Sequence, residues 1–405
     1  MAPEDISPEH RRVLLLQGPC SFFFSYLGEA LRAHGAEVHR ILLCPGDALF
    51  WRGGGAISYR GRAEAWPGFV AWTARQEGIT DMVCLGDGRS WHAQAIAALR
   101  PLGIRIHVVE QGYLRPSRRT VERDGTGGNT RFPRDWPGIE ALAANANTSA
   151  QPNFRAGFLN YATMDVAWNL ANLMAGPVLY PHYRPHALDG PLRDWRGWIG
   201  KLLATPWRQR RAAQAMDAIK AHTGPVFGMA LQLETDFQIR LHGPPGGLRA
   251  ALEGVLQSFA HHAPSKALLL VKQHPLDNGL AGWRDRVAGR AVFLDGGDLD
   301  TVLSRASGLI TVNSTVGLTA LAAGVPVKTL GRAIYDLPGL THQGSIDRFW
   351  TAPDPVSPDR LTCLLRALEH IHVHGNFDGE GARPGAEAMA ERILLPEHET
   401  VLPIG

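Results

Sequence analysis

Short apolar runs alternate with helical patterns along the first 110 residues of the chain. Each run has the length of one buried strand and ends in a polar or glycine-rich turn, which is typical of a parallel sheet covered by helices. Helical spacing of apolar positions is clearest over 22–33 and 93–99. Strands are expected at 12–17, 39–43, 81–85 and 105–109.

A second alternation of the same kind occupies residues 226 to about 372. Its strands are expected at 226–230, 267–271, 291–294, 309–312 and 326–330. Between the two alternations, 117–155 is polar and rich in turn residues, so we expect an irregular excursion or lid. The following segment, 158–221, is mostly helical in pattern and is broken by Pro177, Pro181, Pro185, Pro191 and Pro206.

A chain of 405 residues is too long for one ordinary core and fits two domains. The fold class predicted is α/β, with two doubly wound Rossmann-like domains facing a cleft. The expected parts are an N-terminal acceptor and catalytic domain (1–155), a helical linker (156–222), a C-terminal nucleotide-sugar domain (223–375) and a tail packing back (376–405). A helical piece is expected near 386–395 in that tail.

Composition narrows the class of protein further. Hydrophobic residues make up 45% and charged residues 20%, which is ordinary for a globular protein, and the formal charge of +3 does not suggest nucleic acid. No apolar run is long enough to span a membrane, and the polar start, 1–12, is unlike a signal peptide. The four cysteines form no CxxC pair, so we expect buried free thiols in a reducing cytoplasm rather than zinc ligands or disulfides.

The richest chemical pattern lies in the second alternation. His274 follows a strand and precedes Pro275, and about forty residues later Asn313–Gly317 forms a small-residue turn between a strand and a short helix. Such a turn is expected to point free backbone N–H groups and hydroxyls at a phosphate, although a histidine in this place can also only cap a strand end. The residues expected to bind the nucleotide are Gln273, His274, Pro275, Asn313, Ser314, Thr315 and Gly317.

A second group of polar residues follows other strands. Glu110 ends a strand in Val-Val-Glu-Gln-Gly-Tyr-Leu-Arg-Pro, where a carboxylate could act as base or nucleophile at an anomeric carbon, or could simply pair with Arg115. The accompanying density of ionisable groups favours a functional cleft. The residues expected to bind substrate are Gln17, Gly18, Asp87, Arg89, His92, Arg115, Gln232, Asp236, Gln238 and Arg332.

The segment 160–220 combines tryptophans with arginines. A basic, Trp-bearing amphipathic stretch can lie on an anionic membrane surface, and it can equally be a helical pair whose tryptophans are core and whose arginines are solvated. Both interpretations stay open. The residues concerned are Trp168, Trp195, Trp198, Trp207, Arg193, Arg196, Lys201, Arg208, Arg210 and Arg211.

Several of these motifs occur together in one order and resemble a known family. The motifs are 16–19, 45–47 with Phe50-Trp51, 86–89 with His92, 110–116, 273–275 and 331–341. Together they resemble the bacterial capsule polysaccharide biosynthesis proteins of the KpsS/LipB type, over residues 13 to about 350. That family resembles β-Kdo glycosyltransferases, and the two-domain arrangement is the one called GT-B.

The resemblance implies transfer of β-Kdo from CMP-Kdo to a lysophosphatidylglycerol-type lipid, in synthesis of the capsule linker of Gram-negative bacteria. Residues 273–275 and 313–315 would then hold CMP, Glu110 and His274 would be catalytic, and Arg115, Arg89 and Arg332 would meet the Kdo carboxylate. Retention of configuration is implied because donor and product are both β in this family. Related transferases have Glu-Asp-Gly where this chain has Glu110-Gln111-Gly112.

The predictions about the sugar donor and the metal also depend on residues that this chain lacks. Common GT-B enzymes carry a glutamate where this chain has Thr319, which favours a CMP-sugar over a nucleoside-diphosphate sugar. A departing monophosphate carries less charge than a diphosphate, so a histidine and hydroxyls could stabilise it, and we expect no metal and no other cofactor. Asp298 and Asp300 resemble a DxD pair, but Asp298 is expected to cap a helix beginning near Leu299.

Alternatives from other classes remain. One is a transferase for another CMP-sugar such as a sialic acid, or an epimerase of similar fold, and another is a non-catalytic capsule export or assembly protein. The resemblance implies a cytoplasmic protein, peripheral at the inner face of the inner membrane. Its expected partners are a CMP-sugar, a phospholipid acceptor, an anionic membrane surface and other capsule assembly proteins, and no nucleic acid is expected.

Overall fold

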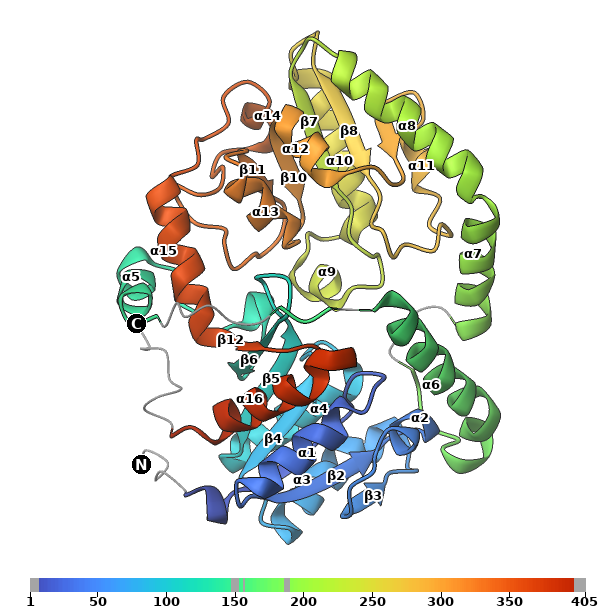
Figure 1. The fold of residues 1–405 in the computed structure, drawn as a ribbon, viewed down its shortest axis with the longest axis vertical. Helices are drawn as coiled ribbons and strands as arrows, with labels where there is room; N and C mark the ends of the chain where they lie inside the picture. Colours follow the sequence, from blue (N-terminus) through green and yellow to red (C-terminus); the bar gives the residue numbers. More distant parts are fainter. Residues whose placement is uncertain (1–6, 147–152, 156, 186–189, 397–405) are drawn as a thin grey trace. The chain divides into compact units, whose positions relative to one another are not determined.

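The chain forms two compact α/β units in a computed structural model that describes residues 7–146, 153–155, 157–185 and 190–396 (Figure 1). One unit takes the described residues of Met1–His186 and Leu365–Gly405, and the other takes those of Ala187–Leu364. Parts of four predictions lie outside the described residues: the polar start, the end of the excursion, residues 186–189 of the helical segment and the end of the tail. The doubly wound α/β class is confirmed within each unit by the sheet orders that follow.

The first unit contains a seven-stranded sheet in the order β12-β6-β5-β4-β1-β2-β3. The strands from β5 to β3 are mutually parallel, and β6 and β12 extend the sheet in antiparallel fashion. The strands are β1 (Arg12–Leu15), β2 (Glu37–Leu42), β3 (Ala56–Ser58), β4 (Asp81–Leu85), β5 (Arg105–Gln111), β6 (Arg118–Arg123) and β12 (His372–His374).

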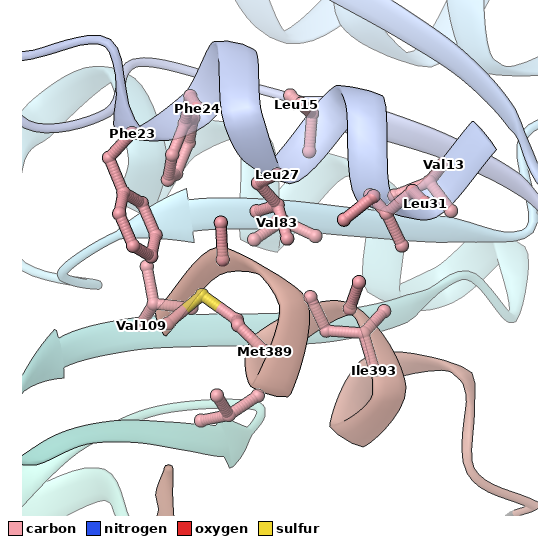
Figure 2. Close-up of a cluster of buried hydrophobic side chains, with 14 of the residues drawn as sticks. Val13, Leu15, Phe23, Phe24, Leu27, Leu31, Val83, Val109, Met389 and Ile393 are labelled. Atoms are coloured by element: carbon pink, nitrogen blue, oxygen red, sulfur yellow. The ribbon is translucent and has the colours of Figure 1, made fainter. Parts of the chain in front are cut away.

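Helices cover both faces of this sheet. On one face, α1 (Phe23–Ala33) and α16 (Ala382–Leu394) pack against each other and against Val13, Val83 and Val109 of the central strands (Figure 2). On the other face, α3 (Trp66–Gln76) and α4 (Ser90–Leu99) bury a second cluster. The remaining helices of the unit are α2 (Pro45–Leu49), α5 (Trp136–Ala144) and α6 (Phe158–Leu179), with 3-10 turns at Pro8–His10, Ala63–Ala65, Arg100–Leu102, Gly127–Asn129, Glu369–Ile371 and Gly379–Gly381.

A buried ionic cluster fastens the C-terminal helix to this sheet. Arg11 donates to Asp81 at 2.8 Å and also to the carbonyl oxygens of Ile393 and Leu395, at the end of α16. Burial opposes ionisation of Asp81, but the hydrogen bond and charge of His107 and the charges of Arg105 and Arg11 hold the pKa of this carboxyl below its ordinary value. The helix near 386–395 therefore belongs to the core of the first unit.

The second unit contains a five-stranded, all-parallel sheet in the order β11-β10-β7-β8-β9. The strands are β7 (Val226–Ala230), β8 (Leu268–Lys272), β9 (Val292–Leu294), β10 (Ala306–Thr311) and β11 (Val327–Thr329). The helices are α7 (Pro191–Leu203), α8 (Thr205–Ala221), α9 (Phe237–His242), α10 (Gly247–His262), α11 (Trp283–Val287), α12 (Leu299–Arg305), α13 (Val316–Ala322) and α14 (Ile346–Phe349), with α15 (Pro358–Leu368) leading out of the unit.

Each sheet has one point where the strand order reverses. In the first unit the chain runs outward from β1 to β3 in one direction and from β4 to β5 in the other, so the reversal lies between β1 and β4. In the second unit it lies between β7 and β10. Ligands of open α/β sheets bind outside the carboxyl ends of the strands at such a reversal, so these two places are where a site is expected.

Several local predictions were wrong. The excursion at 117–155 contains a sheet strand, β6, and a helix, α5, because charged side chains of β6 find tertiary partners: Arg118 pairs with Glu369 at 2.8 Å and Arg119 donates to Asn376 at 3.0 Å. Pro177 does not break α6, since it lies near the end of that helix and removes one N–H donor.

The cysteines are all free, as predicted, but their burial differs. Cys44 and Cys84 are buried, whereas Cys20 and Cys363 are half-buried. Burial, followed by the charge of Asp165, raises the pKa of Cys20 to about 12, so this thiol stays protonated at neutral pH.

Candidate functional site

Three carboxyl groups gather at the carboxyl ends of β4 and β5 in the first unit. Glu110 belongs to β5, Asp87 follows β4, and Glu122 of β6 pairs in register with Val108. A methyl group on Gly86, whose φ is +69°, would lie 3.2 Å from Glu110 Oε2, so glycine leaves room for this carboxylate. Burial is the main cause that raises the pKa of Glu122, and the charges of Asp87 and Glu110 add to it.

Glu122 is the innermost of these acids. It accepts a hydrogen bond from Tyr113 Oη at 3.1 Å and a very short one from Thr130 Oγ1. Burial is the main reason that its pKa rises to about 8. Tyr113 Oη in turn accepts from the backbone N–H of Gly127 at 2.8 Å. Glu122 therefore holds the loop 126–130 beside the acids.

That loop reaches Asp87 directly. Asn129 Nδ2 donates to Asp87 Oδ2 at 2.8 Å, and Thr126 Oγ1 lies 3.4 Å from Oδ1. Asp87 is 6% exposed and Glu122 is 3% exposed, whereas Glu110 is half-buried. Of the three acids, Glu110 is the one that a substrate can reach.

Glu110 and Gln111 point to opposite faces of the sheet, because successive side chains of a strand alternate. Glu110 shares its face with Val108 and the cluster under α3 and α4, while the exposed Gln111 shares the face of Val109. Gln111 therefore does not stand beside the acidic cluster.

A hydrogen-bonded glutamine bridges the reversal point of the first sheet. Gln17 follows β1, accepts from Arg89 Nη1 at 3.3 Å, and donates to Asp47 at 3.1 Å. It is 2% exposed, so it positions Arg89 and Asp47 rather than contacting a ligand itself. Gly18 lies against Phe24, whose ring would be 2.6 Å from an added Cβ, which explains the glycine at this strand exit.

Two other predicted substrate residues occupy different environments. His92 is fully buried, and its Nδ1 donates to the carbonyl oxygens of Leu85 and Gly86 at 3.0 and 2.9 Å. Burial and then the charge of Arg89 lower the pKa of His92 to about 3, so the ring is neutral and supports the β4 exit instead of reaching a substrate. Arg115 is exposed and stays a candidate for binding an anion.

The reversal point of the second sheet is bridged by two neutral amides. Gln232 Nε2 donates to Asn313 Oδ1 at 2.8 Å, and the backbone N–H of Asn313 donates back to Gln232 Oε1 at 3.1 Å. Asn313 Nδ2 also donates to the carbonyl oxygen of Gln238 at 2.9 Å, and Asp236 caps α9 by accepting from the Gln238 N–H at 2.9 Å. Gln232 and Asp236, predicted to bind substrate, and Asn313, predicted to bind the nucleotide, thus build a frame with the backbone of Gln238 that joins β7, β10 and α9.

His274 follows β8 and is half-buried. Its Nδ1 accepts from the N–H of Leu276 at 3.1 Å, which places the proton of the neutral ring on Nε2, the nitrogen suited to donate to a phosphate oxygen. Neighbouring Gln273 donates to Asp277 at 2.6 Å, and the carbonyl of Pro275 accepts from Lys201 at 2.8 Å. Gln273 and Pro275 therefore shape the loop that presents His274.

The turn 313–317 differs from expectation, because its backbone N–H groups are largely engaged. Those of Ser314 and Val316 donate to Thr311 Oγ1 and Ser314 Oγ, both at 3.3 Å, and that of Gly317 donates to Ser314 O at 3.0 Å. The prediction that this turn presents a set of free N–H donors is wrong. The groups of this turn that remain candidates for contacting a ligand are the half-buried side chains of Ser314 and Thr315.

A buried tyrosine sets the position of this turn. Tyr335 Oη donates to Ser314 O at 2.5 Å. A Cβ added to Gly317 would lie 2.1 Å from the same Tyr335 Oη. Close packing against Tyr335 therefore requires glycine at position 317.

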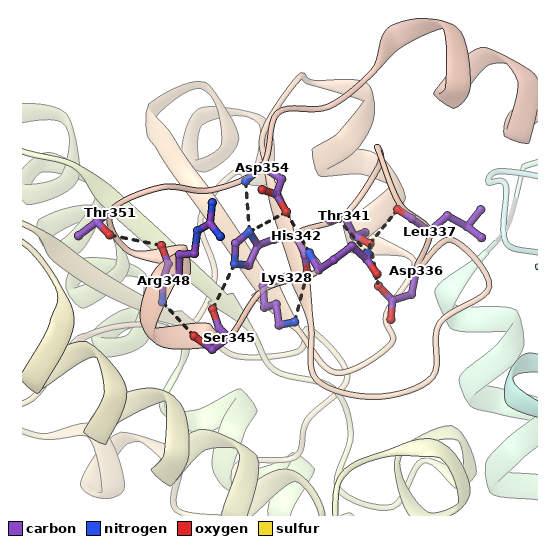
Figure 3. A network of polar contacts seen from close by, with 10 residues as sticks. Lys328, Asp336, Leu337, Thr341, His342, Ser345, Arg348, Thr351 and Asp354 are labelled. Carbon is purple, nitrogen blue, oxygen red and sulfur yellow. Dashed lines mark hydrogen bonds and ion pairs between the residues drawn. The ribbon is translucent and has the colours of Figure 1, made fainter.

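Arg332 lines an open pocket of about 350 Å³. Leu241, His242, Gly243, Thr329, Leu330, Gly331 and Asp336 complete the lining. The segment that follows is fixed by a polar network in which Thr341 donates to Asp336 at 2.7 Å and the buried His342 lies 3.0 Å from Asp354 (Figure 3). The exposed Arg332 thus belongs to a well-held strand exit and can meet an anionic group.

The tryptophans and arginines of 160–220 include both side chains held within the protein and exposed ones. Trp168 is 7% exposed and packs with Cys44 and Phe50, so it is core, whereas Trp207 is 65% exposed. Arg208 donates to both carboxylate oxygens of Asp295, at 2.5 and 2.6 Å, so its guanidinium is already paired within the protein.

Sequence reasoning missed Glu122, Tyr113 and Tyr335. Glu122 and Tyr113 fell in or beside a segment that looked irregular, and Tyr335 was recognised only as part of a motif. Asp298 does cap α12, as predicted, by accepting from Thr301 N at 2.8 Å. Among the described residues no group of three His, Cys, Asp or Glu side chains could hold a metal ion, and no helix there is long and apolar enough to cross a membrane.

Comparison with known proteins places these features in context. The profile of the family described as capsule polysaccharide biosynthesis protein matches residues 80–377. Capsule polysaccharide modification protein LipB of Neisseria meningitidis serogroup B is 32% identical over 389 residues, covering 90% of this chain and 91% of LipB. Capsule polysaccharide export protein KpsS of Escherichia coli is 28% identical over 352 residues, covering 84% of this chain and 90% of KpsS.

Among solved structures, KpsC of Thermosulfurimonas dismutans, a β-Kdo 2,7 transferase, is similar over 95% of this chain and 99% of its own. Its sequence identity is 14% and the TM-score is 0.45.

Proposed function

Because this chain belongs to the capsule polysaccharide biosynthesis protein family, we propose that it is a glycosyltransferase that moves β-Kdo from CMP-Kdo to a lysophosphatidylglycerol-type lipid. The observation that carries the proposal is the acidic cluster of the first unit, in which Glu110 is accessible while Asp87 and Glu122 are buried. This arrangement supports a single reactive carboxylate held in a fixed place.

In the proposed reaction, the Glu110 carboxylate attacks the anomeric carbon and CMP departs with the electrons of the broken C–O bond. The acceptor hydroxyl then attacks the same carbon and loses its proton, and the carboxylate is released. Two inversions give net retention. His274 Nε2–H would donate to the departing phosphate, with Ser314 and Thr315 beside the nucleotide.

The Kdo carboxylate requires a cationic partner, for which Arg115, Arg89 and Arg332 are proposed in that order. Arg89 is held by Gln17, whereas Arg115 and Arg332 are exposed. Metal-independent transfer is part of the proposal, since CMP departs as a monophosphate.

The direct test is to incubate the protein with CMP-Kdo and a fluorescent lysophosphatidylglycerol dispersed in detergent. A slower-migrating lipid product, lost in Glu110→Gln and in His274→Ala, would support the proposal. Product from CMP-sialic acid in place of CMP-Kdo would favour the other CMP-sugar transferase. CMP binding without any product would favour a different donor sugar or acceptor, and absence of CMP binding would favour a non-catalytic export or assembly role.

A further inference from the structure

The helices α7 and α8 follow each other on the second unit and change direction where they meet (Figure 1). Ala204, the one residue between them (φ −81°, ψ −1°), caps both helices. At 3.6 residues per turn, Asp194, Gly197 and Lys201 share one face of α7, and Arg208 lies in the first turn of α8.

That face is bonded to the rest of the unit at every turn. Asp194 accepts from Asn278 at 2.6 Å, and Gly197 packs so closely that an added Cβ would lie 2.9 Å from Leu280. Lys201 donates to the carbonyl oxygens of Pro275 and Asp277, and Arg208 pairs with Asp295. These contacts therefore fix which faces of α7 and α8 are turned toward their unit.

The opposite face is apolar and exposed. Leu192, Ile199, Leu203 and Trp207, spaced seven and four residues apart, are 63%, 58%, 72% and 65% exposed. Leu202, at the edge of this face, is 66% exposed. A contiguous apolar stripe with a tryptophan at one end is the kind of surface that lies in a membrane interface.

Basic side chains lie on or beside this apolar stripe, and acidic side chains do not. Arg196 and Arg210 fall on the same face by helical periodicity, Arg211 lies beside it, and all three are exposed. Asp194, the one acidic residue between 191 and 212, is on the seated face and bonded to Asn278. Positive charge beside exposed leucines favours binding to the surface of a membrane that contains anionic lipid.

We propose that the outward face of α7 and α8, made of Leu192, Arg196, Ile199, Leu203, Trp207 and Arg210, docks the protein on a membrane containing anionic lipid. This inference rests on the proposed function only in that a lipid acceptor requires such an approach. The exposed stripe of α6, with Leu170 and Met174, carries no cation of its own, so the same argument does not extend to it.

The test is flotation of the protein with vesicles of phosphatidylcholine and phosphatidylglycerol in equal amounts, without any sugar donor. The charge variant is Arg196→Gln, Arg210→Gln and Arg211→Gln together. At about 1 kcal/mol per arginine near an anionic surface, its affinity for these vesicles should fall by roughly 100-fold. Raising the salt concentration should weaken the wild type and affect the variant little.

The matched control is Arg62→Gln, Arg75→Gln and Arg366→Gln, three exposed arginines outside α7 and α8. This control should bind as the wild type does. Equal loss in both triple variants would mean that net charge alone drives binding, and unchanged binding of the first variant would equally overturn the proposal.

The apolar part is tested by Trp207→Gln, with Trp72→Gln as its control because Trp72 is 58% exposed on α3. Trp207→Gln should reduce vesicle binding by about tenfold and Trp72→Gln should not. If light scattering instead shows a dimer that Trp207→Gln dissociates, the face binds a second copy and the lipid proposal fails. Transfer to lysolipid in detergent is read separately, so failure of docking and failure of the transferase proposal are distinguishable.

Discussion

The two sheets use the same device at their reversal points but with different chemistry. In each unit a glutamine that follows the first strand hydrogen-bonds across the reversal: Gln17 to Arg89 in the first, and Gln232 to Asn313 in the second. The first bridge is flanked by Asp47 and lies at the same sheet edge as Asp87 and Glu110. The second joins neutral amides, and the side chains that follow β8 and β10 at the same sheet edge include His274, Ser314 and Thr315.

The difference assigns separate tasks to two similar folds. Charged groups that are partly buried can have shifted pKa values and take part in bond-making, whereas amides and hydroxyls hold a ligand without ionising. On this account the first unit carries the reactive carboxylate and the second carries the nucleotide.

The largest effect is expected from the reactive acid. Glu110→Gln keeps the size of the side chain and removes its nucleophilic oxygen, so product formation should fall by about 10³-fold or more. The control is Gln111→Ala, on the opposite face of the same strand, which should retain activity. Comparable losses in the two variants, measured by initial rates with CMP-Kdo and detergent-dispersed lysolipid, would contradict the division.

The next effect concerns the turn after β10. Gly317→Ala would push a methyl group against Tyr335 Oη and disturb its bond to Ser314, at a cost of about 1–3 kcal/mol in the free energy of unfolding. CMP affinity should fall with it, while Gly254→Ala, in open space on α10, should leave both unchanged or raise stability slightly. Urea unfolding measures the free energy of unfolding of each variant, and calorimetry measures its affinity for CMP. If neither changes in Gly317→Ala, the turn adapts to the added methyl group.

The amide bridge of the second unit should be energetically coupled. Asn313→Ala leaves the buried Gln232 without its side-chain partner and should cost about 1–3 kcal/mol, as should Gln232→Ala. The double variant should cost less than the sum of the single ones by at least about 0.5 kcal/mol. Strict additivity in urea unfolding would mean that the bridge is not formed.

A pH-dependent effect should distinguish Glu122 from surface acids. Burial raises its pKa to about 8, and the nearby charges of Asp87 and Glu110 add to this. In the unfolded chain a glutamate loses its proton near pH ~4.3, so the contribution of Glu122 to folded stability should decline from there through pH 8 by up to about 1.4 kcal/mol per pH unit.

Glu122→Gln cannot ionise, so its unfolding free energy should decline less over the same range, whereas Glu140→Gln, on the exposed side of α5, should follow the wild type. Parallel curves for Glu122→Gln and wild type would show that Glu122 is not protonated in the folded protein.

The smallest expected effect is that of metal removal. Product formation should be unchanged by EDTA, because the proposed reaction uses His274 and hydroxyls at the departing phosphate. Loss of product in EDTA with recovery on adding magnesium would contradict that part of the mechanism.

Much of the fold could be predicted because it depends on local pattern. The apolar runs of β1, β4, β8 and β10 are continuous and end in polar turns, so the strands and their exits were identified. His274 and Glu110 were predicted for the same reason, since Glu110 lies at the carboxyl end of β5 and His274 comes shortly after β8. Pattern also identified Asp298 as a helix cap.

What sequence could not show depends on distant partners. β6 reads Arg-Arg-Thr-Val-Glu-Arg, and its first two arginines bond to Glu369 and Asn376, some 250 residues away in the sequence. Glu122 is buried because Tyr113 and Thr130 satisfy its oxygens. The turn after β10 uses up its N–H groups through Thr311 and Ser314, which no spacing rule reveals.

Calorimetric titration of CMP into wild type, Glu110→Gln and His274→Ala tests the central claim most directly, because it separates nucleotide binding from transfer. The account predicts that Glu110→Gln binds CMP as tightly as wild type, although it forms no product, and that His274→Ala binds at least about tenfold more weakly. Loss of CMP binding in Glu110→Gln, or unchanged binding in His274→Ala, would contradict the separation of the acid from the nucleotide.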